Sequence, residues 1–223
     1  MESNNEVSKN ILKSGTSIVG IVCKDGVIMA ADRRATAGGQ LVVSKNSRKV
    51  VQVNDYITVS GTGVAADIDM VQRVFAAELK LKELKSHSRP SVEEAANFLG
   101  MMVYRNIRSP SMIPPIVGLL LAGFNESGST ELYSIEPAGT VSRVDDYDAN
   151  FGSGMQYILG LLERQYKKDM SLKDGVELAK ECIKSSSQRD TGSGNGIDVF
   201  TITKDGIKQV ISEEAVSEYK DSK

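Results

Sequence analysis

The spacing of apolar residues changes along this chain, and the order of those changes restricts the possible folds more than any other feature. Short runs rich in β-branched residues predict strands at 17–23, 27–31 and 56–60, with a short element at about 49–53. Between 65 and 85 the apolar residues recur every three or four positions, which predicts an amphipathic helix. A second helix is predicted over 91–107, because Ser91 and Glu94 have the spacing of a capping box.

The second half of the chain repeats this order. Strands are predicted at 116–124, 131–135, 141–147, 197–203 and 207–210. Between the third and fourth of them, helices are predicted at about 155–167 and 172–186, the second capped by Ser171. Strands and helices come in groups, unlike the alternation of a βαβ series. We therefore expect one α+β domain, a four-layer αββα sandwich of two antiparallel sheets between two helix layers.

Composition excludes several classes of protein. With 223 residues, of which 40% are hydrophobic, the chain can bury a sizeable core. A net charge of -2 and a pI near 5.6 argue against a general nucleic-acid binder. No apolar run reaches the roughly 18 residues that span a bilayer. We therefore expect neither nucleic acid nor membrane as a partner, and a cytoplasmic location.

Cysteine and histidine are too few to build a metal site or a disulfide framework. Cys23 and Cys182 lie in apolar patterns, which predicts two buried thiols. The single His87 lies in a polar stretch and is expected at the surface. One histidine supports neither a zinc site nor a serine triad. We expect no metal and no cofactor.

The two ends of the chain differ from the middle. Residues 1–15 are polar and without periodicity, which predicts a flexible tail, and they lack the apolar run of about 7 to 15 residues that a signal peptide needs. Residues 213–223 are charged and are expected to be mobile. A single domain over 16–212 is predicted between them.

The first two strands bring a threonine and a carboxylate together. Thr16 opens the first strand directly after Gly15, and Asp32 closes the second. Lys-Asp-Gly at 24–26 predicts a hairpin, in which the end of the second strand lies beside the start of the first. A buried carboxylate needs a partner, and the candidates are Arg33, Arg34, Arg48 and Lys49.

A glycine-rich segment offers a different function. Residues 61–66, Gly-Thr-Gly-Val-Ala-Ala, match the dinucleotide-binding fingerprint. That fingerprint belongs to a parallel βαβ unit, whereas a second helix follows here. Dinucleotide binding through Gly61–Ala66 is therefore the alternative to a tight turn whose backbone N–H groups stabilise an anion. The glycine-rich turns at 152–154 and 190–196 lack the Gly-Lys-Ser/Thr of a phosphate loop.

Taken together, the motifs give the chain a recognisable likeness from Gly15 to about Ser212. They are Gly-Thr-Ser-Ile-Val-Gly, Ala-Ala-Asp-Arg-Arg-Ala-Thr, Lys49 before an apolar stretch, Gly-Thr-Gly-Val-Ala-Ala-Asp, Gly-Ser-Gly and Gln-Arg-Asp-Thr-Gly-Ser-Gly. In this order they resemble a β subunit of the 20S proteasome, most like the archaeal type. A shorter bacterial two-ring relative with the same nucleophile is the nearest alternative family.

The resemblance implies a threonine-type endopeptidase with the N-terminal nucleophile hydrolase fold. It implies that Thr16 is the nucleophile, exposed when autocatalytic cleavage at Gly15–Thr16 removes residues 1–15 as a propeptide. Asp32 and Lys49 match the charged partners of the nucleophile, and Gly63 matches the residue whose N–H forms the oxyanion hole. Three further residues match the group that supports the N-terminal amine: Ser153, Asp190 and Ser193.

The chemistry of such a site also follows from the residues. A threonine hydroxyl needs an adjacent base, and its own α-amine, with a reference pKa of about 7.7–8.0, can serve. Two like charges at about 4 Å repel by about 4 kcal/mol at an effective dielectric of about 20, and about 1.4 kcal/mol moves a pKa by one unit. Lys49 is thus sufficient to lower the pKa of the amine, with Asp32 as its counter-charge.

The resemblance also implies a substrate pocket and partners. The pocket positions are Ala35, Gly61, Ala65 and Asp69. Gly61 leaves the pocket wide and Asp69 places a carboxylate at its base, which favours basic or bulky side chains. The implied partners are proteasome α subunits, other β subunits in two stacked heptameric rings, an ATP-driven unfoldase and unfolded polypeptide substrates. An inactive structural β subunit of the same ring is the alternative.

Overall fold

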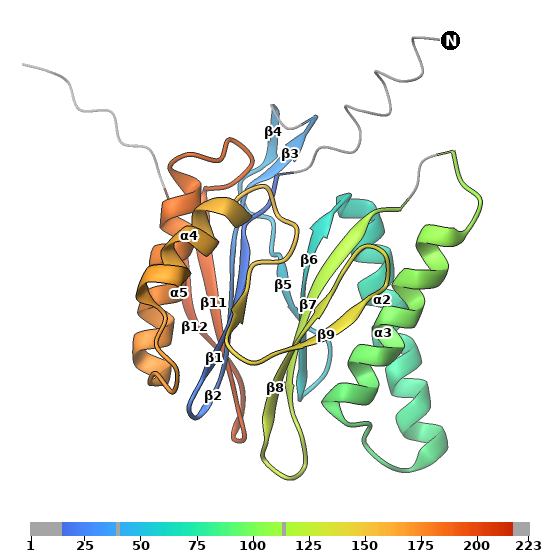
Figure 1. The fold of residues 1–223 in the computed structure, drawn as a ribbon. Helices are drawn as coiled ribbons and strands as arrows, with labels where there is room; N and C mark the ends of the chain where they lie inside the picture. The colour runs from blue at the N-terminus through green and yellow to red at the C-terminus, as the bar shows by residue number, and fades with distance from the viewer. Residues whose placement is uncertain (1–14, 39–40, 113–114, 216–223) are drawn as a thin grey trace, which may run out of the picture.

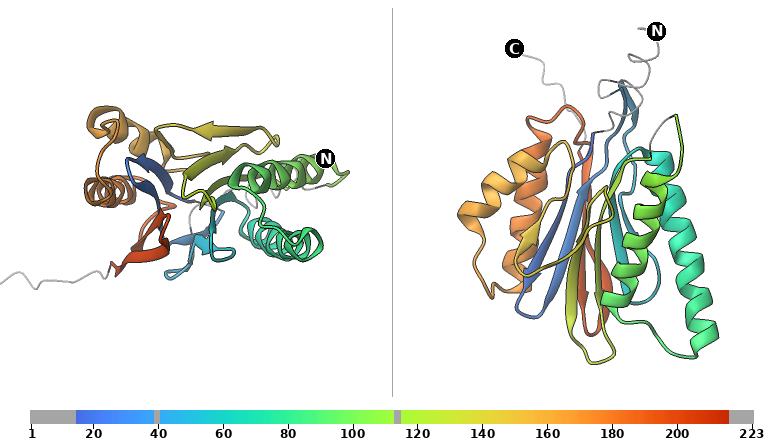
Figure 2. Two further views of the ribbon diagram at one scale, coloured as in Figure 1. Left: turned by 90° about the horizontal axis from the view of Figure 1, so that it is seen from below. Right: turned by 45° about the vertical axis from the view of Figure 1, so that its right-hand side comes forward.

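The computed structural model describes residues 15–38, 41–112 and 115–215. Two five-stranded antiparallel sheets pack face to face, and helices cover the outer face of each (Figure 1). Viewed from below, in Figure 2, the sheets lie between one helix pair on each side. The predicted α+β sandwich of four layers is therefore confirmed.

The first sheet carries the hairpin at the start of the described chain. Its strands are, in spatial order, β10 (Tyr147–Asp148), β1 (Ile18–Cys23), β2 (Gly26–Asp32), β11 (Gly196–Thr203) and β12 (Gly206–Glu214). In the predicted β1–β2 hairpin Ile18 pairs with Ala31. This register places the end of β2 beside the residues just before β1.

The second sheet is formed by the middle of the chain. Its strands are, in spatial order, β5 (Val50–Gln52), β6 (Ile57–Gly63), β7 (Val117–Phe124), β8 (Thr130–Ile135) and β9 (Val141–Val144). A separate hairpin of β3 (Ala35–Ala37) and β4 (Leu41–Ser44) projects beyond the sheets. This hairpin was not predicted.

The four helices of the described residues lie close to the predicted ranges. They are α2 (Ala65–Ser86), α3 (Val92–Arg108), α4 (Met155–Gln165) and α5 (Leu172–Ser187). The capping box of Ser91 and Glu94 starts α3, and Ser171 caps α5, both as predicted. In α2, Phe75 and Leu79 are buried, whereas Leu84, near the end of the helix, is 61% exposed.

Several strand boundaries differ from the prediction. The strand predicted at 141–147 is two strands in different sheets, β9 and β10, because the chain passes from one sheet to the other at Asp145 and Asp146. β6 continues to Gly63 instead of ending at Ser60, and β12 continues to Glu214. The predicted tail at 1–15 lies outside the described residues except for Gly15, as does the C-terminal tail beyond residue 215.

The apolar core has three parts, one under each helix pair and one between the sheets. The part between the sheets includes Ile18, Met29, Leu120, Ala122 and Leu132. Cys23 and Cys182 are buried as predicted, and burial raises the pKa of each thiol to about 12. His87 is exposed at the end of α2, also as predicted.

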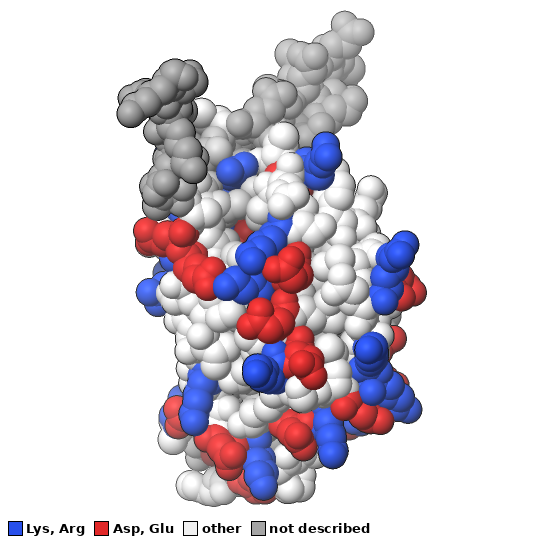
Figure 3. All heavy atoms as spheres, turned by 90° about the vertical axis from the view of Figure 1, so that its left-hand side faces the viewer, with Lys and Arg blue, Asp and Glu red and all other residues white. Residues whose placement is uncertain are grey.

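The outer surface of the α4–α5 layer is charged with both signs. Figure 3, turned toward the side that these helices cover in Figure 1, shows lysine and arginine side chains interspersed with acidic ones. Lys180 pairs with Glu213 at 2.6 Å and Lys184 with Glu181 at 2.9 Å. Among the described residues, no helix combines the length and apolarity required to cross a membrane.

Candidate active site

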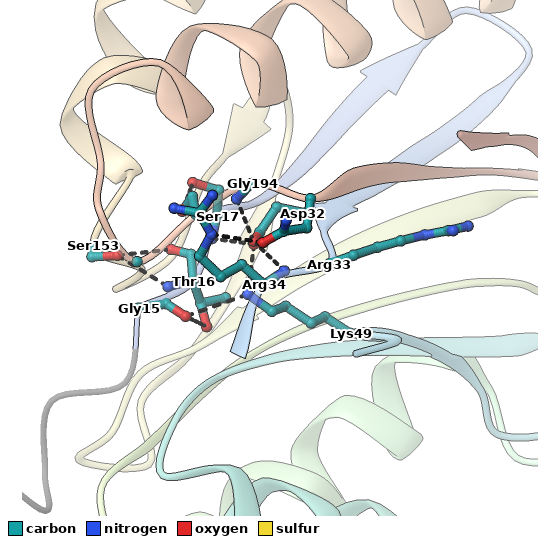
Figure 4. A network of polar contacts seen from close by, with 12 residues as sticks. Gly15, Thr16, Ser17, Asp32, Arg33, Arg34, Lys49, Ser153 and Gly194 are labelled. Carbon is teal, nitrogen blue, oxygen red and sulfur yellow. Dashed lines mark hydrogen bonds and ion pairs between the residues drawn. The ribbon is translucent and has the colours of Figure 1, made fainter. Parts of the chain in front are cut away.

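Just before β1, one carbonyl oxygen accepts hydrogen bonds from both a hydroxyl group and a lysine ammonium group. Thr16 Oγ1 donates a hydrogen bond to the Gly15 carbonyl oxygen at 2.6 Å, and Lys49 Nζ donates to the same oxygen at 3.3 Å (Figure 4). The backbone N–H of Thr16 donates to Ser153 Oγ at 3.0 Å. Both sides of the Gly15–Thr16 peptide bond therefore contact polar side chains.

Asp32 ends β2 beside this peptide bond and is fully buried. Its Oδ1 accepts hydrogen bonds from the Ser17 N–H at 2.9 Å and from Lys49 Nζ at 2.6 Å. Its Oδ2 accepts from the N–H groups of Arg34 and Gly194, both at 2.9 Å. The four donors compensate the cost of removing a carboxylate from water.

Lys49 precedes β5 and is the candidate whose side chain pairs with Asp32. The Lys49 side chain is only 8% exposed. Burial lowers its pKa, and the attraction of Asp32 opposes that shift. Another candidate, Arg33, instead pairs with buried Asp198 through Nε at 3.1 Å and Nη2 at 2.5 Å.

Two loops complete the polar cluster around Thr16. Ser153, in the loop before α4, and Ser193, in the loop after α5, both donate to Asp190 Oδ2 at 2.5 Å. The Ser193 hydroxyl also lies 2.7 Å from the hydroxyl of Ser17. The structure thus brings together the three residues that the resemblance assigned to amine support.

Glycines permit the close approach of these loops to the start of β1. A Cβ on Gly15 would lie 2.0 Å from Gly192 Cα, and a Cβ on Gly152 would lie 2.4 Å from the Thr16 carbonyl oxygen. Gly63, at the end of β6, has a φ of 120°, and a Cβ there would lie 2.1 Å from the Ile116 carbonyl oxygen. No other residue type fits these positions without movement of backbone.

A cavity of about 360 Å³ opens beside Thr16. Its lining includes Lys49, Gly63 and all four predicted pocket residues, namely Ala35, Gly61, Ala65 and Asp69. The cavity is narrower at Gly61 than expected, because the Ile68 side chain fills the space beside this glycine. A Cβ on Gly61 would lie 2.6 Å from Ile68 Cγ2. Asp69 is not an isolated carboxylate, because it pairs with Arg73 at 2.5 Å and its side chain is 60% exposed.

The dinucleotide-binding alternative for Gly61–Ala66 is wrong. Gly61 and Gly63 belong to β6, which pairs antiparallel with β5 and β7. All strand pairs among the described residues are antiparallel. The parallel βαβ unit that places a pyrophosphate at a helix N-terminus is therefore missing from this part of the chain.

Sequence reasoning missed Thr36, and it named Arg34 only as a candidate partner of Asp32. Thr36 Oγ1 accepts a hydrogen bond from the Gly15 N–H at 3.0 Å. The Arg34 side chain binds the loop after α5, donating to Asn195 Oδ1 at 2.8 Å and to the Thr191 carbonyl at 2.9 Å. Both belong to the quoted motif Ala-Ala-Asp-Arg-Arg-Ala-Thr, but the predicted hairpin indicated only that Asp32 lies near Thr16.

Comparisons with known proteins show which proteins the chain is similar to. A family model described as "Proteasome subunit" matches residues 12–202. A "Proteasome subunit beta" of Nanoarchaeum equitans is 39% identical over 89% of this chain and 98% of its own length. A "Proteasome subunit beta" of Methanopyrus kandleri is 36% identical over 91% and 94%, and a "Proteasome subunit beta 1" of Thermococcus onnurineus is 39% identical over 90% and 94%.

Proposed function

Because the chain belongs to the proteasome subunit family, we propose that it is a catalytic β subunit of a 20S core particle. In this proposal Thr16 is the nucleophile of a threonine-type endopeptidase. The observation that carries it is the contact of Thr16 Oγ1 with the Gly15 carbonyl oxygen, to which Lys49 also donates. The hydroxyl and the cation both lie at the peptide bond that must be cleaved to free the Thr16 amine.

Cleavage of the Gly15–Thr16 bond needs no cofactor. Thr16 Oγ adds to the Gly15 carbonyl carbon and gives up its proton, while negative charge develops on the carbonyl oxygen beside Lys49 Nζ. The carbon–nitrogen bond then breaks, the Thr16 nitrogen takes a proton, and an ester between Gly15 and the threonine oxygen remains. Water hydrolyses the ester, which leaves a Gly15 carboxylate, a free amine and a free hydroxyl on Thr16.

The mature site would use the Thr16 amine as the base for its own hydroxyl. The charge of Lys49 lowers the pKa of that amine and so increases its neutral fraction near pH 7. Ser153, which contacts the Thr16 nitrogen at 3.0 Å, orients it. The N–H of Gly63 would bind the developing oxyanion, a contact whose loss costs about 3–4 kcal/mol in comparable enzymes.

The proposal extends to the assembly and the substrate. Membership of the family supports assembly with other proteasome subunits. We propose that these are α subunits and other β subunits, in two stacked heptameric β rings. An ATP-driven unfoldase would deliver unfolded polypeptides, in the cytoplasm. Residues 1–15 would be the propeptide, 16–212 the catalytic domain and 213–223 a charged extension.

The test is the intact mass of the β chain after assembly with its matching α subunit. The proposal expects a chain that begins at Thr16, and an intact tail on Thr16→Ala. Thr16→Ser keeps a hydroxyl and should still lose the tail. Thr130→Ala, in β8, is the control and should be processed normally. An intact tail on the native chain in assembled particles would instead indicate an inactive structural subunit.

A further inference from the structure

Asn150 lies in the loop between β10 and α4, and its carboxamide reaches the second sheet. The residue is 3% exposed and has a φ of 47°, a left-handed conformation that asparagine adopts more readily than most residues. β10 pairs with β1 in the first sheet. The loop after β10 therefore continues from a strand of the first sheet. The Asn150 side chain connects this loop to the second sheet.

The carboxamide of Asn150 bonds to three strands of the second sheet. Its Nδ2 donates to the Leu119 carbonyl in β7 at 3.1 Å and to Ser134 Oγ in β8 at 3.2 Å. Its Oδ1 accepts from Thr62 Oγ1 in β6 at 3.1 Å and from the Phe151 N–H at 2.8 Å. A buried polar network that is satisfied in this way is rigid.

The surrounding residues fit a carboxamide. A Cβ on Gly118 would lie 2.2 Å from Asn150 Oδ1, so the strand leaves room for this side chain. An aspartate at position 150 could not donate to the Leu119 and Ser134 oxygens, and it would carry a charge into a buried site. Both the donors and the acceptor of Asn150 are used.

The loop and the strand that Asn150 joins each hold part of the candidate site. On the loop side, Ser153 Oγ accepts from the Thr16 N–H, and the Gly154 N–H donates to the Thr16 carbonyl at 3.3 Å. On the strand side, Thr62 directly precedes Gly63. We propose that Asn150 is a positioning residue that fixes the Thr16 nitrogen against the Gly63 backbone.

This inference rests on the proposed function. A substrate carbonyl must meet Thr16 Oγ and the Gly63 N–H at the same time, and those groups come from different sheets. A displacement of about 1 Å at a reacting group can cost about 100-fold in rate. A direct bond between the loop and the strand removes one source of such displacement.

The test uses assembled, processed particles and counts active sites with an electrophilic peptide that reacts covalently with Thr16. Asn150→Gly keeps the left-handed backbone and removes the carboxamide. We expect kcat per reacted site to fall by about 10- to 100-fold, with KM within about twofold. The acid limb of the pH profile of kcat/KM should also shift, because the contact between Ser153 and the Thr16 amine changes. Asn54→Gly, at the turn before β6, is the control and should change neither kcat per reacted site nor the pH profile.

A second pair of variants keeps the test valid if Asn150→Gly fails to assemble. Thr62→Val removes the hydroxyl that donates to Asn150 and should lower kcat. Thr62→Ser keeps a hydroxyl and should retain the native kcat. Normal kcat per reacted site with fewer particles, or an equal loss in Thr62→Ser and Thr62→Val, would overturn the inference. If a variant is not processed, a separate protease can expose Thr16. A native chain that never reacts with the probe would contradict the proposed function instead.

Discussion

Asp32 and Lys49 form an ion pair that is almost completely removed from water. Such a pair is weak evidence for stability, because the cost of desolvation offsets much of the attraction. Asp32 accepts three further hydrogen bonds from backbone N–H groups, so its position is fixed independently of Lys49. A buried lysine with a lowered pKa beside a cluster of polar loop residues is typical of a functional site.

The pair of Asp69 and Arg73 provides a prediction about specificity. If Asp69 attracts basic substrate side chains, Asp69→Asn should lower the ratio of kcat/KM for peptides ending in arginine over peptides ending in leucine. The effect should be about two- to fivefold, since Asp69 is largely exposed and screened. Arg73→Gln releases the carboxylate and should raise the ratio by a similar factor. The measurement is the hydrolysis of the two peptides by assembled particles.

The control for this prediction is Glu78→Gln, which removes an exposed charge from the same helix outside the cavity. It should leave the ratio unchanged. Equal ratios in the native particle and in both variants would show that Asp69 does not contribute to selection.

Local sequence logic predicted one half of the site better than the other. The proximity of Thr16 and Asp32 follows from a hairpin with a recognisable turn, which is a short-range feature. The role of Asn150 could not be predicted, because its partners Thr62, Leu119 and Ser134 come from three distant strands. A single asparagine after a short strand has no pattern that distinguishes it from a turn residue.

At the level of elements, helices were predicted more accurately than strands. The caps Ser91 and Ser171 mark the helix starts through local hydrogen bonds, so the sequence around them is sufficient. The division of 141–147 into β9 and β10 depends on which sheet supplies the partner strand, and strand propensity does not encode the partner. The β3–β4 hairpin lies outside both sheets, and its exposed Leu41 and Val43 do not show the alternation of a half-buried strand.

Two helical glycines differ in their surroundings and so in their predicted response to alanine. Gly160 lies within α4 and is exposed, and a Cβ there would meet no heavy atom within 4 Å, whereas a Cβ on Gly100 in α3 would lie 2.2 Å from Val141 Cγ2. Gly160→Ala should raise the free energy of unfolding by about 0.5–1 kcal/mol. Gly100→Ala should lower it, since overpacking costs about 1–3 kcal/mol. Urea unfolding followed by circular dichroism measures both.

Each glycine variant serves as the control for the other, because the two substitutions bring the same gain in intrinsic helix propensity. Equal effects of Gly160→Ala and Gly100→Ala would contradict the close packing of α3 on β9.

At the scale of the whole molecule, the candidate site is divided between the two sheets. Thr16 and Asp32 flank the β1–β2 hairpin of the first sheet, while Lys49 and Gly63 flank β5 and β6 of the second. The packing of one sheet on the other therefore sets the distances among these groups. The apolar contacts between the sheets are part of the functional geometry for this reason.

The contact between Gly20 in β1 and Leu132 in β8 tests this packing. A Cβ on Gly20 would lie 2.8 Å from Leu132 Cδ2, and Leu132 is fully buried. Leu132→Ala alone should cost about 2–5 kcal/mol of stability through the cavity it leaves, and Gly20→Ala alone about 1–3 kcal/mol through overpacking. The double variant should cost less than the sum, since the added methyl group enters the space that leucine vacated. We expect a coupling energy of at least about 0.5 kcal/mol from urea unfolding.

Leu41→Ala is the matched control for this cycle, because Leu41 is 66% exposed in β4 and should change stability by no more than about 0.5 kcal/mol. If Gly20→Ala and Leu132→Ala were additive, the sheets would not meet at this contact. A coupled pair would also connect stability to catalysis, because Gly20 lies on the strand that begins two residues after Thr16. In assembled particles, Gly20→Ala should then lower kcat per active site, and adding Leu132→Ala should recover part of that loss.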